Sequence, residues 1–157
     1  MLAYFAYLQA SMGPLMPFVR AELGLNYTVT GFHFSALAVG MVLAGLTGDK
    51  LVKRTSRRFV LWFGAAGMAF GAIGLTISSQ VMFTISSILL MGWLGTFVLI
   101  MVQATLSDHH GALRAIALTE SNVIASIGAS LAPFFVGRLQ GAGVGWEGAL
   151  YLSLIHI

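Results

Sequence analysis

An uncharged stretch of 49 residues, from Phe59 to Ser107, limits what this chain can fold into. As one helix it would be about 73 Å long, more than twice the ~30 Å hydrocarbon core of a bilayer. The only polar cluster placed to divide it is Ser78-Ser79-Gln80. We therefore predict two membrane-spanning helices, over 59–78 and 81–106, joined by a very short turn.

The composition of the whole chain agrees with a lipid environment. Of the 157 residues, 58% are hydrophobic and only 8% are charged, whereas a soluble domain has about 25% charged residues. A chain this apolar could not cover its own surface with polar groups. Cations gather in one short segment instead of forming a basic face, so no nucleic-acid partner is expected. There is no cysteine, and we predict no metal site and no cofactor.

The other apolar stretches complete an all-α, polytopic membrane helix bundle over 1–151. Further spans are predicted over 1–19, 30–48 and 114–137, with the start of a sixth over 146–157, which makes five transmembrane helices plus a partial one. Small residues recur at helical spacing on one face of the second and third spans and on one side of the fourth. These are Ala36, Gly40, Ala44 and Gly48, then Gly64, Gly67, Gly71 and Gly74, then Gly92 and Gly95. We expect these faces to meet other helices, because close contact drives helix association in lipid.

A strongly basic segment over 45–58 is predicted to be a tight loop between the second and third spans. It holds five of the eight Lys and Arg residues. With Arg114, the connections on this side hold six cations, against Arg20 and Arg138 on the other. Lys and Arg near span ends resist translocation. We therefore predict that 50–58 and 107–114 face the cytoplasm and that 20–28 and 138–146 face outward. His109 and His110 are interpreted as part of a solvated loop.

The basic segment also resembles a family signature. Gly45, Asp49, Lys50, Lys53 and Arg54 match G-x-L-x-D-R/K-x-G-R/K-R/K, the pattern between the second and third helices of the major facilitator superfamily of secondary transporters. Thr47 stands where the family prefers Leu, and Val52 where it prefers Gly. The alternative interpretation is an ordinary cytoplasmic loop with a chance Gly and Asp. Farther along, Gly128, Ala132, Pro133 and Gly137 resemble the fifth-helix pattern G-x-x-x-G-P-x-x-G, with Ala132 replacing a Gly and Gly137 displaced by one position.

The resemblance implies the N-terminal half of a twelve-helix transporter that moves a small solute by alternating access and is not an enzyme. Its partners would be membrane lipid, an absent C-terminal half and an unidentified solute, in a bacterial cytoplasmic membrane. Asp49 and the neighbouring cations would form part of an inner gate. The segment 152–157 matches a translated sequencing-adapter end, so we expect it not to be native. The alternative function is a non-transporting membrane scaffold or assembly subunit.

Three polar side chains inside the predicted spans are candidates for an intramembrane site. Glu120 is ionisable, and such groups in a span usually face a cavity or a partner. Equally, it could lie near enough to the inner surface to reach water or the loop cations. Asn122 and Gln103 could hydrogen-bond between helices without further function. His33 is interpreted as hydrogen-bonded packing. Residues 85–88 lack the Arg that proton-driven members of the family often carry.

Overall fold

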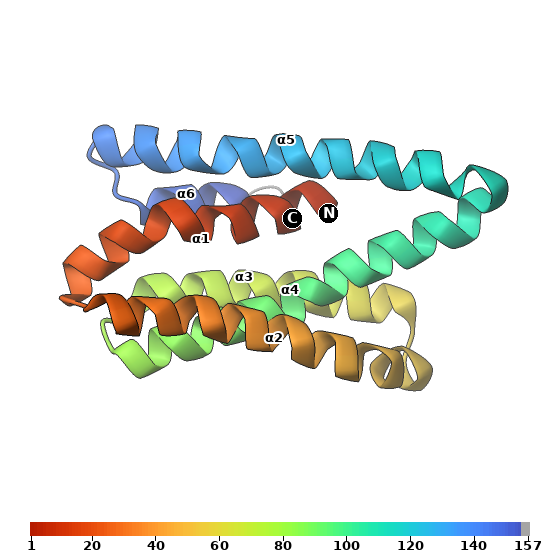
Figure 1. Ribbon diagram of the computed structural model, residues 1–157, viewed down its shortest axis with the longest axis horizontal. Coiled ribbons are helices and arrows are strands. Elements are labelled where there is room, and N and C mark those ends of the chain that lie inside the picture. The colour runs from red at the N-terminus through yellow and green to blue at the C-terminus, as the bar shows by residue number, and fades with distance from the viewer. Residues whose placement is uncertain (155–157) are drawn as a thin grey trace.

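The computed structural model describes residues 1–154, which form six α-helices and no strand within that range (Figure 1). The helices are α1 (Leu2–Leu23), α2 (Tyr27–Arg54), α3 (Arg57–Ile77), α4 (Val81–His110), α5 (Arg114–Gly141) and α6 (Glu147–Leu154), with a short 3₁₀ helix η1 (Gly111–Leu113) before α5. The predicted all-α helical bundle is confirmed. Residues 155–157 of the predicted sixth span and of the suspected adapter tail lie outside the described residues.

Three helical stretches are long and apolar enough to cross a membrane. They are Tyr27–Arg54, Arg57–Ile77 and Val81–Gly141, the last of which comprises α4, η1 and α5. The first helix, α1, is not among them, because Tyr4, Tyr7, Gln9 and two prolines lower its hydropathy. It is nevertheless buried along much of its length against α5.

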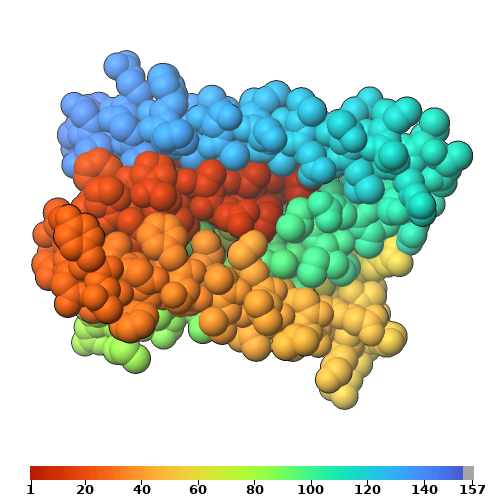
Figure 2. Space-filling model, in the orientation of Figure 1, coloured from red at the N-terminus to blue at the C-terminus, as the bar shows by residue number. Residues whose placement is uncertain are grey.

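The helices form two groups. One contains α1, α5 and α6, and the other contains α2, α3 and α4 (Figure 1). The long α4 helix packs on α2 and α3, then crosses the bundle diagonally and approaches α5 where the two are joined. The face shown in Figure 2 is made mainly by α5, α1, α4 and α2, while little of α3 and α6 is visible there.

The helix boundaries differ from the prediction at three connections. The basic segment is helical as far as Arg54, and only Thr55 and Ser56 separate α2 from α3. It has no Pro or other helix-breaking residue after Gly48, and Leu, Lys and Arg are good helix formers. The predicted connection over 20–28 is helical through Leu23, and the predicted loop at His109 and His110 is the last turn of α4. The predicted tight loop was therefore wrong.

Polar caps mark the true helix ends. Gly24, with φ of 61°, ends α1 in the left-handed conformation that Gly adopts readily. The Asn26 side chain accepts a 2.8 Å hydrogen bond from the Val29 N–H at the start of α2. The Ser56 hydroxyl accepts one from the Phe59 N–H at the start of α3. These caps satisfy backbone donors that a helix start leaves free.

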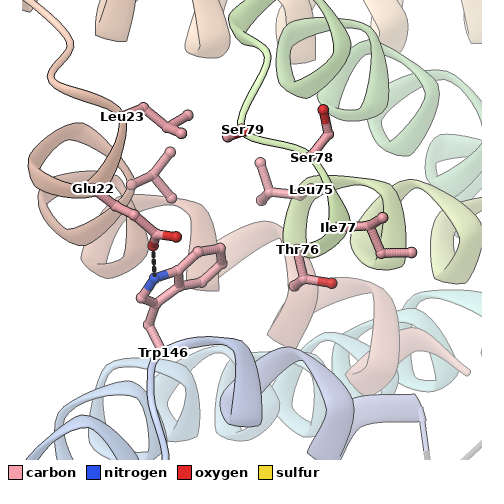
Figure 3. A pocket seen from close by; sticks show the side chains of 9 residues that line it. Glu22, Leu23, Leu75, Thr76, Ile77, Ser78, Ser79 and Trp146 are labelled. Atoms are coloured by element: carbon pink, nitrogen blue, oxygen red, sulfur yellow. Dashed lines mark hydrogen bonds between the residues drawn. The ribbon is translucent and has the colours of Figure 1, made fainter.

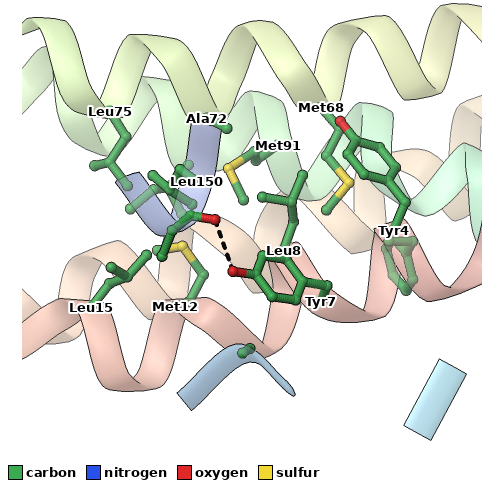
Figure 4. Close-up of a cluster of buried hydrophobic side chains, with 14 of the residues drawn as sticks. Tyr4, Tyr7, Leu8, Met12, Leu15, Met68, Ala72, Leu75, Met91 and Leu150 are labelled. Carbon is green, nitrogen blue, oxygen red and sulfur yellow. Dashed lines mark hydrogen bonds between the residues drawn. The ribbon is translucent and has the colours of Figure 1, made fainter. Parts of the chain in front are cut away.

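The core lies where α1 faces α3, α4 and α6 (Figure 4). Leu8, Met12 and Leu15 of α1 are almost fully buried there. Two tyrosines in the same helix place their hydroxyls on backbone carbonyls. The Tyr4 hydroxyl donates to the Ala65 oxygen at 3.2 Å, and the Tyr7 hydroxyl to the Ala149 oxygen at 2.8 Å. Because a buried hydroxyl needs a partner, these bonds fix α1 against α3 and α6.

The small-residue faces meet other helices, as predicted. Ala36, Gly40, Ala44 and Gly48 are all buried, and a Cβ on Gly40 would collide with the Leu89 carbonyl and the Trp93 backbone nitrogen of α4. On α3, a Cβ on Gly64 would lie 2.7 Å from the Leu94 carbonyl oxygen. The expectation that Gly92 and Gly95 share one side was wrong. Gly92 approaches Leu37 of α2 and Gly95 approaches Met68 of α3, because α4 lies between the two helices.

Candidate functional site

The signature residues lie in the last turns of α2, at the end of the bundle that we call the basic end. This end carries Lys50, Lys53, Arg54, Arg57, Arg58 and Arg114. The Asp49 carboxylate accepts a hydrogen bond from the Lys53 ammonium at 2.7 Å, one helical turn later. Their side chains are 73% and 74% exposed. An exposed pair at this spacing contributes only about 0.3–0.5 kcal/mol, so it leaves the carboxylate available to other partners.

The two departures from the family signature both serve local packing. The Thr47 hydroxyl accepts a hydrogen bond from the Trp93 indole N–H of α4 at 2.9 Å and lies 2.6 Å from the Leu43 carbonyl oxygen. Val52 is half-buried and packs beside the cluster that contains Phe97. In contrast, Gly45 is exposed, and a Cβ there would meet nothing within 4 Å. The described residues therefore give no packing reason for Gly at position 45.

An ion pair that sequence reasoning missed ties two helices together at the basic end. The Arg57 guanidinium at the start of α3 contacts the Asp108 carboxylate in the last turn of α4. Among the described residues, this pair and Asp49–Lys53 are the two ion pairs. From the sequence, Arg57 was expected to act only as one of the cations that set topology, and Asp108 was expected to lie in a connection. The available signal was two opposite charges at predicted span ends on the same side of the membrane.

The fifth-helix pattern divides between two faces of α5. Gly128 and Ala132 are buried, and a Cβ on Gly128 would lie 2.7 Å from the Ala3 carbonyl oxygen of α1. Pro133 and Gly137 are exposed on the far side. Gly128 also borders an apolar pocket of about 450 Å³ between α1, α5 and α6. The pattern thus combines a close helix contact with an exposed surface.

The three candidates for an intramembrane site are not joined by any described hydrogen bond. Glu120 and Asn122 are exposed on α5, and Gln103 is half-buried on α4. The exposed polar stripe that continues from Asn122 makes its hydrogen bonds within α5. The Ser126 and Ser130 hydroxyls donate to backbone carbonyls four residues earlier. Within residues 1–154, no three His, Asp or Glu residues gather as a metal site.

These features define a class of protein. A bundle of long apolar helices, with most of its charges at helix ends, is an integral membrane protein. The sequence model of the Major Facilitator Superfamily matches residues 1–156, and the chain belongs to that family. A comparison with the curated proteins gave no match. Family membership implies transmembrane transport, and the family consists of transporters rather than enzymes.

Proposed function

We propose that the chain is one helical half of a secondary active transporter that moves a small solute by alternating access. The observation that supports this most is the exposed face of α2. Val42, Leu46, Asp49 and Lys53 follow one another at helical spacing and are all exposed, on the side opposite buried Gly40. A face that is apolar along its length and charged at its end suits contact with another helical body inside the membrane.

The second body would be the C-terminal half of the same transporter, seated on α2 and α5. On α5 as well, large apolar side chains are exposed, among them Ile116, Ile127 and Phe134. Exposed Gly45 and Gly137 lie on these two helices and have no neighbour that requires a small residue. A partner helix that packs closely would supply that requirement. Glu120, Asn122 and Gln103 would then border the solute path between the halves.

Asp49 would act as a gate residue at the inner end of this interface. Its present partner, Lys53, is exposed and holds it weakly. The carboxylate can therefore exchange that partner for a cation or a helix N-terminus of the second half when the inner side closes. Contacts that form in one arrangement of the halves and break in the other are a general basis for switching. We place the basic end in the cytoplasm and the protein in a bacterial cytoplasmic membrane, in contact with lipid.

The test is Asp49→Asn in the complete product of the reading frame. Solute uptake or efflux, normalised to inserted protein, should fall about tenfold or more, because a lost contact of ~1.4 kcal/mol shifts the balance of states by that factor. Arg58→Gln is the matched control, since Arg58 is exposed at the same end and belongs to neither described ion pair. Arg57 is unsuitable as a control because it pairs with Asp108.

Membrane insertion should be unchanged in both variants, because Asp49 is solvent-exposed. Equal transport by Asp49→Asn and Arg58→Gln would reject the gate. If the complete product moved no solute and its reading frame encoded no second helical half, the chain would instead be a membrane scaffold or assembly subunit.

A further inference from the structure

A small pocket lies at the end of the bundle opposite the basic end, where the last turns of α1 and α3 meet the start of α6 (Figure 3). Its volume is about 130 Å³, several times the space that one water molecule needs. Apolar side chains of α1 and α3, together with the indole of Trp146, form part of its wall. Polar groups from Glu22, Thr76, Ser78 and Ser79 also line it.

The Glu22 carboxylate is held in place by this pocket's aromatic residue. Its Oε2 atom accepts a hydrogen bond from the Trp146 indole N–H at 3.0 Å, and Trp146 itself is only 6% exposed (Figure 3). Within the described part of the chain, Glu22 makes no other side-chain hydrogen bond and belongs to neither ion pair. Glu22 is otherwise exposed, so its carboxylate is open to a ligand and has no cationic partner within the described residues.

The end of α3 adds to the negative potential at the same place. The helix stops at Ile77, and Ser78 is extended. Within residues 1–154, no backbone N–H from beyond the helix bonds to the carbonyls of its last turn, and that turn contains no basic residue. Free carbonyls at a helix C-terminus carry partial negative charge and favour a cation. The carboxylate and the helix end thus act on the same small volume.

We propose that this pocket binds a small organic ammonium group, with Glu22 as its counter-ion. The ammonium would donate hydrogen bonds to the carboxylate and to last-turn carbonyls of α3, and its carbon stem would lie against Leu23 and Leu75. The Trp146 ring would add attraction for the cation. A bare metal ion fits less well, because hard cations need several oxygen ligands and Glu22 supplies the one carboxylate among the residues that line the pocket.

Two sources could supply this chemistry, namely the amine of a phosphatidylethanolamine headgroup or a free alkylammonium ion. The pocket is separate from the proposed solute path. It lies between α1, α3 and α6, whereas the side chains proposed to border the solute path lie on α4 and α5. The proposal therefore does not depend on transport.

The experiment uses the full chain purified in an amine-free glycoside detergent. Calorimetry measures binding of ethanolammonium, with ethylene glycol as its neutral analogue. Native mass spectrometry compares retention of phosphatidylethanolamine with that of phosphatidylglycerol. Glu22→Gln removes the charge but keeps an oxygen for Trp146. Glu147→Gln is the matched control, because Glu147 also lies near this end of the bundle but does not line the pocket.

Wild-type protein and Glu147→Gln should bind the amine, and Glu22→Gln should bind it about tenfold or more weakly, as expected for a lost charge-assisted hydrogen bond. Ethylene glycol should not bind. Retention of the amino lipid without binding of ethanolammonium would identify a lipid site, and binding of both would admit either source. Equal binding by Glu22→Gln, equal binding of ethylene glycol, or no binding of either amine would overturn the proposal. If Glu22→Gln fails to fold, the comparison of ethanolammonium with ethylene glycol on wild-type protein still tests whether the pocket requires a cation.

Discussion

His33 has no exposed surface, yet both of its ring nitrogens have partners. Nδ1 lies 2.9 Å from the Val29 carbonyl oxygen, which can only accept, so we assign the proton to Nδ1. Nε2 lies 3.0 Å from the Thr84 hydroxyl oxygen of α4, and the single proton of that hydroxyl is shared between Nε2 and the Val81 carbonyl oxygen, which lies 2.9 Å away. The interpretation of His33 as hydrogen-bonded packing is confirmed. Its partner on α4 was not predictable, because the two residues are 51 positions apart.

We expect Thr84→Val to lower the free energy of unfolding by about 1–3 kcal/mol, because Nε2 is left buried without a partner. Valine nearly matches threonine in shape, so packing around it changes little. Thr84→Ser keeps the hydroxyl and should cost clearly less. Denaturant unfolding of the three proteins in one detergent measures the difference. Indistinguishable stability of Thr84→Val and wild type would show that the His33 bond contributes nothing.

At the scale of helices, glycine positions on α2 differ in what they contact. Gly40 faces the α4 backbone, and a Cβ there would collide with it, whereas Gly45 faces open space. Gly40→Ala should therefore destabilise the bundle by about 1–3 kcal/mol, as overpacking does. Gly45→Ala should be neutral or stabilising by up to ~1 kcal/mol, because Ala favours helix.

Thermal unfolding of both variants in the same detergent tests the pair. The same substitution in the same helix is predicted to destabilise the bundle at position 40 and not at position 45, so general effects of alanine cancel. A Gly40→Ala protein as stable as Gly45→Ala would contradict the close contact between α2 and α4. The proposed contact of Gly45 with a second helical half can be tested only in the complete product of the reading frame.

The sequence allowed helices to be predicted well where length and hydropathy decide, and poorly where local chemistry decides. The division of 59–107 at Ser78-Ser79-Gln80 was correct, because no bilayer accommodates so long a helix. The ends of α2 and α4 were wrong, because charged side chains were equated with loops although they extend helices readily. The Arg57–Asp108 pair was missed because it depends on how α3 packs against α4.

At the scale of the whole molecule, α4 connects two groups of helices that otherwise share few contacts. It packs on α2 and α3 along most of its length and reaches α5 at the basic end (Figure 1). The Arg57–Asp108 pair lies beside this junction, because Asp108 is in the last turn of α4, and the signature residues lie at the same end of the bundle. The candidate site was therefore predictable as a location, from the basic signature. Its working partners were not, because the proposed gate contacts belong to a second half.

The orientation of this end in the membrane is the last prediction. Six of the eight Lys and Arg residues lie at the basic end, and Lys and Arg near span ends are kept in the cytoplasm.

The chain has no cysteine, so a single introduced cysteine can be labelled without background from other thiols. Ser79→Cys, in the exposed turn between α3 and α4, should react with an impermeant maleimide in intact cells. Thr55→Cys, exposed between α2 and α3, should react only after the membrane is opened. Replacement of Thr55 removes no charge, so the signal that sets the orientation stays intact. Equal labelling of both sites in detergent controls for reactivity.

Labelling of Thr55→Cys from outside, with Ser79→Cys protected, would show that the bundle has the opposite orientation in the membrane. It would then place Asp49 on the outer side, where it could not serve as an inner gate.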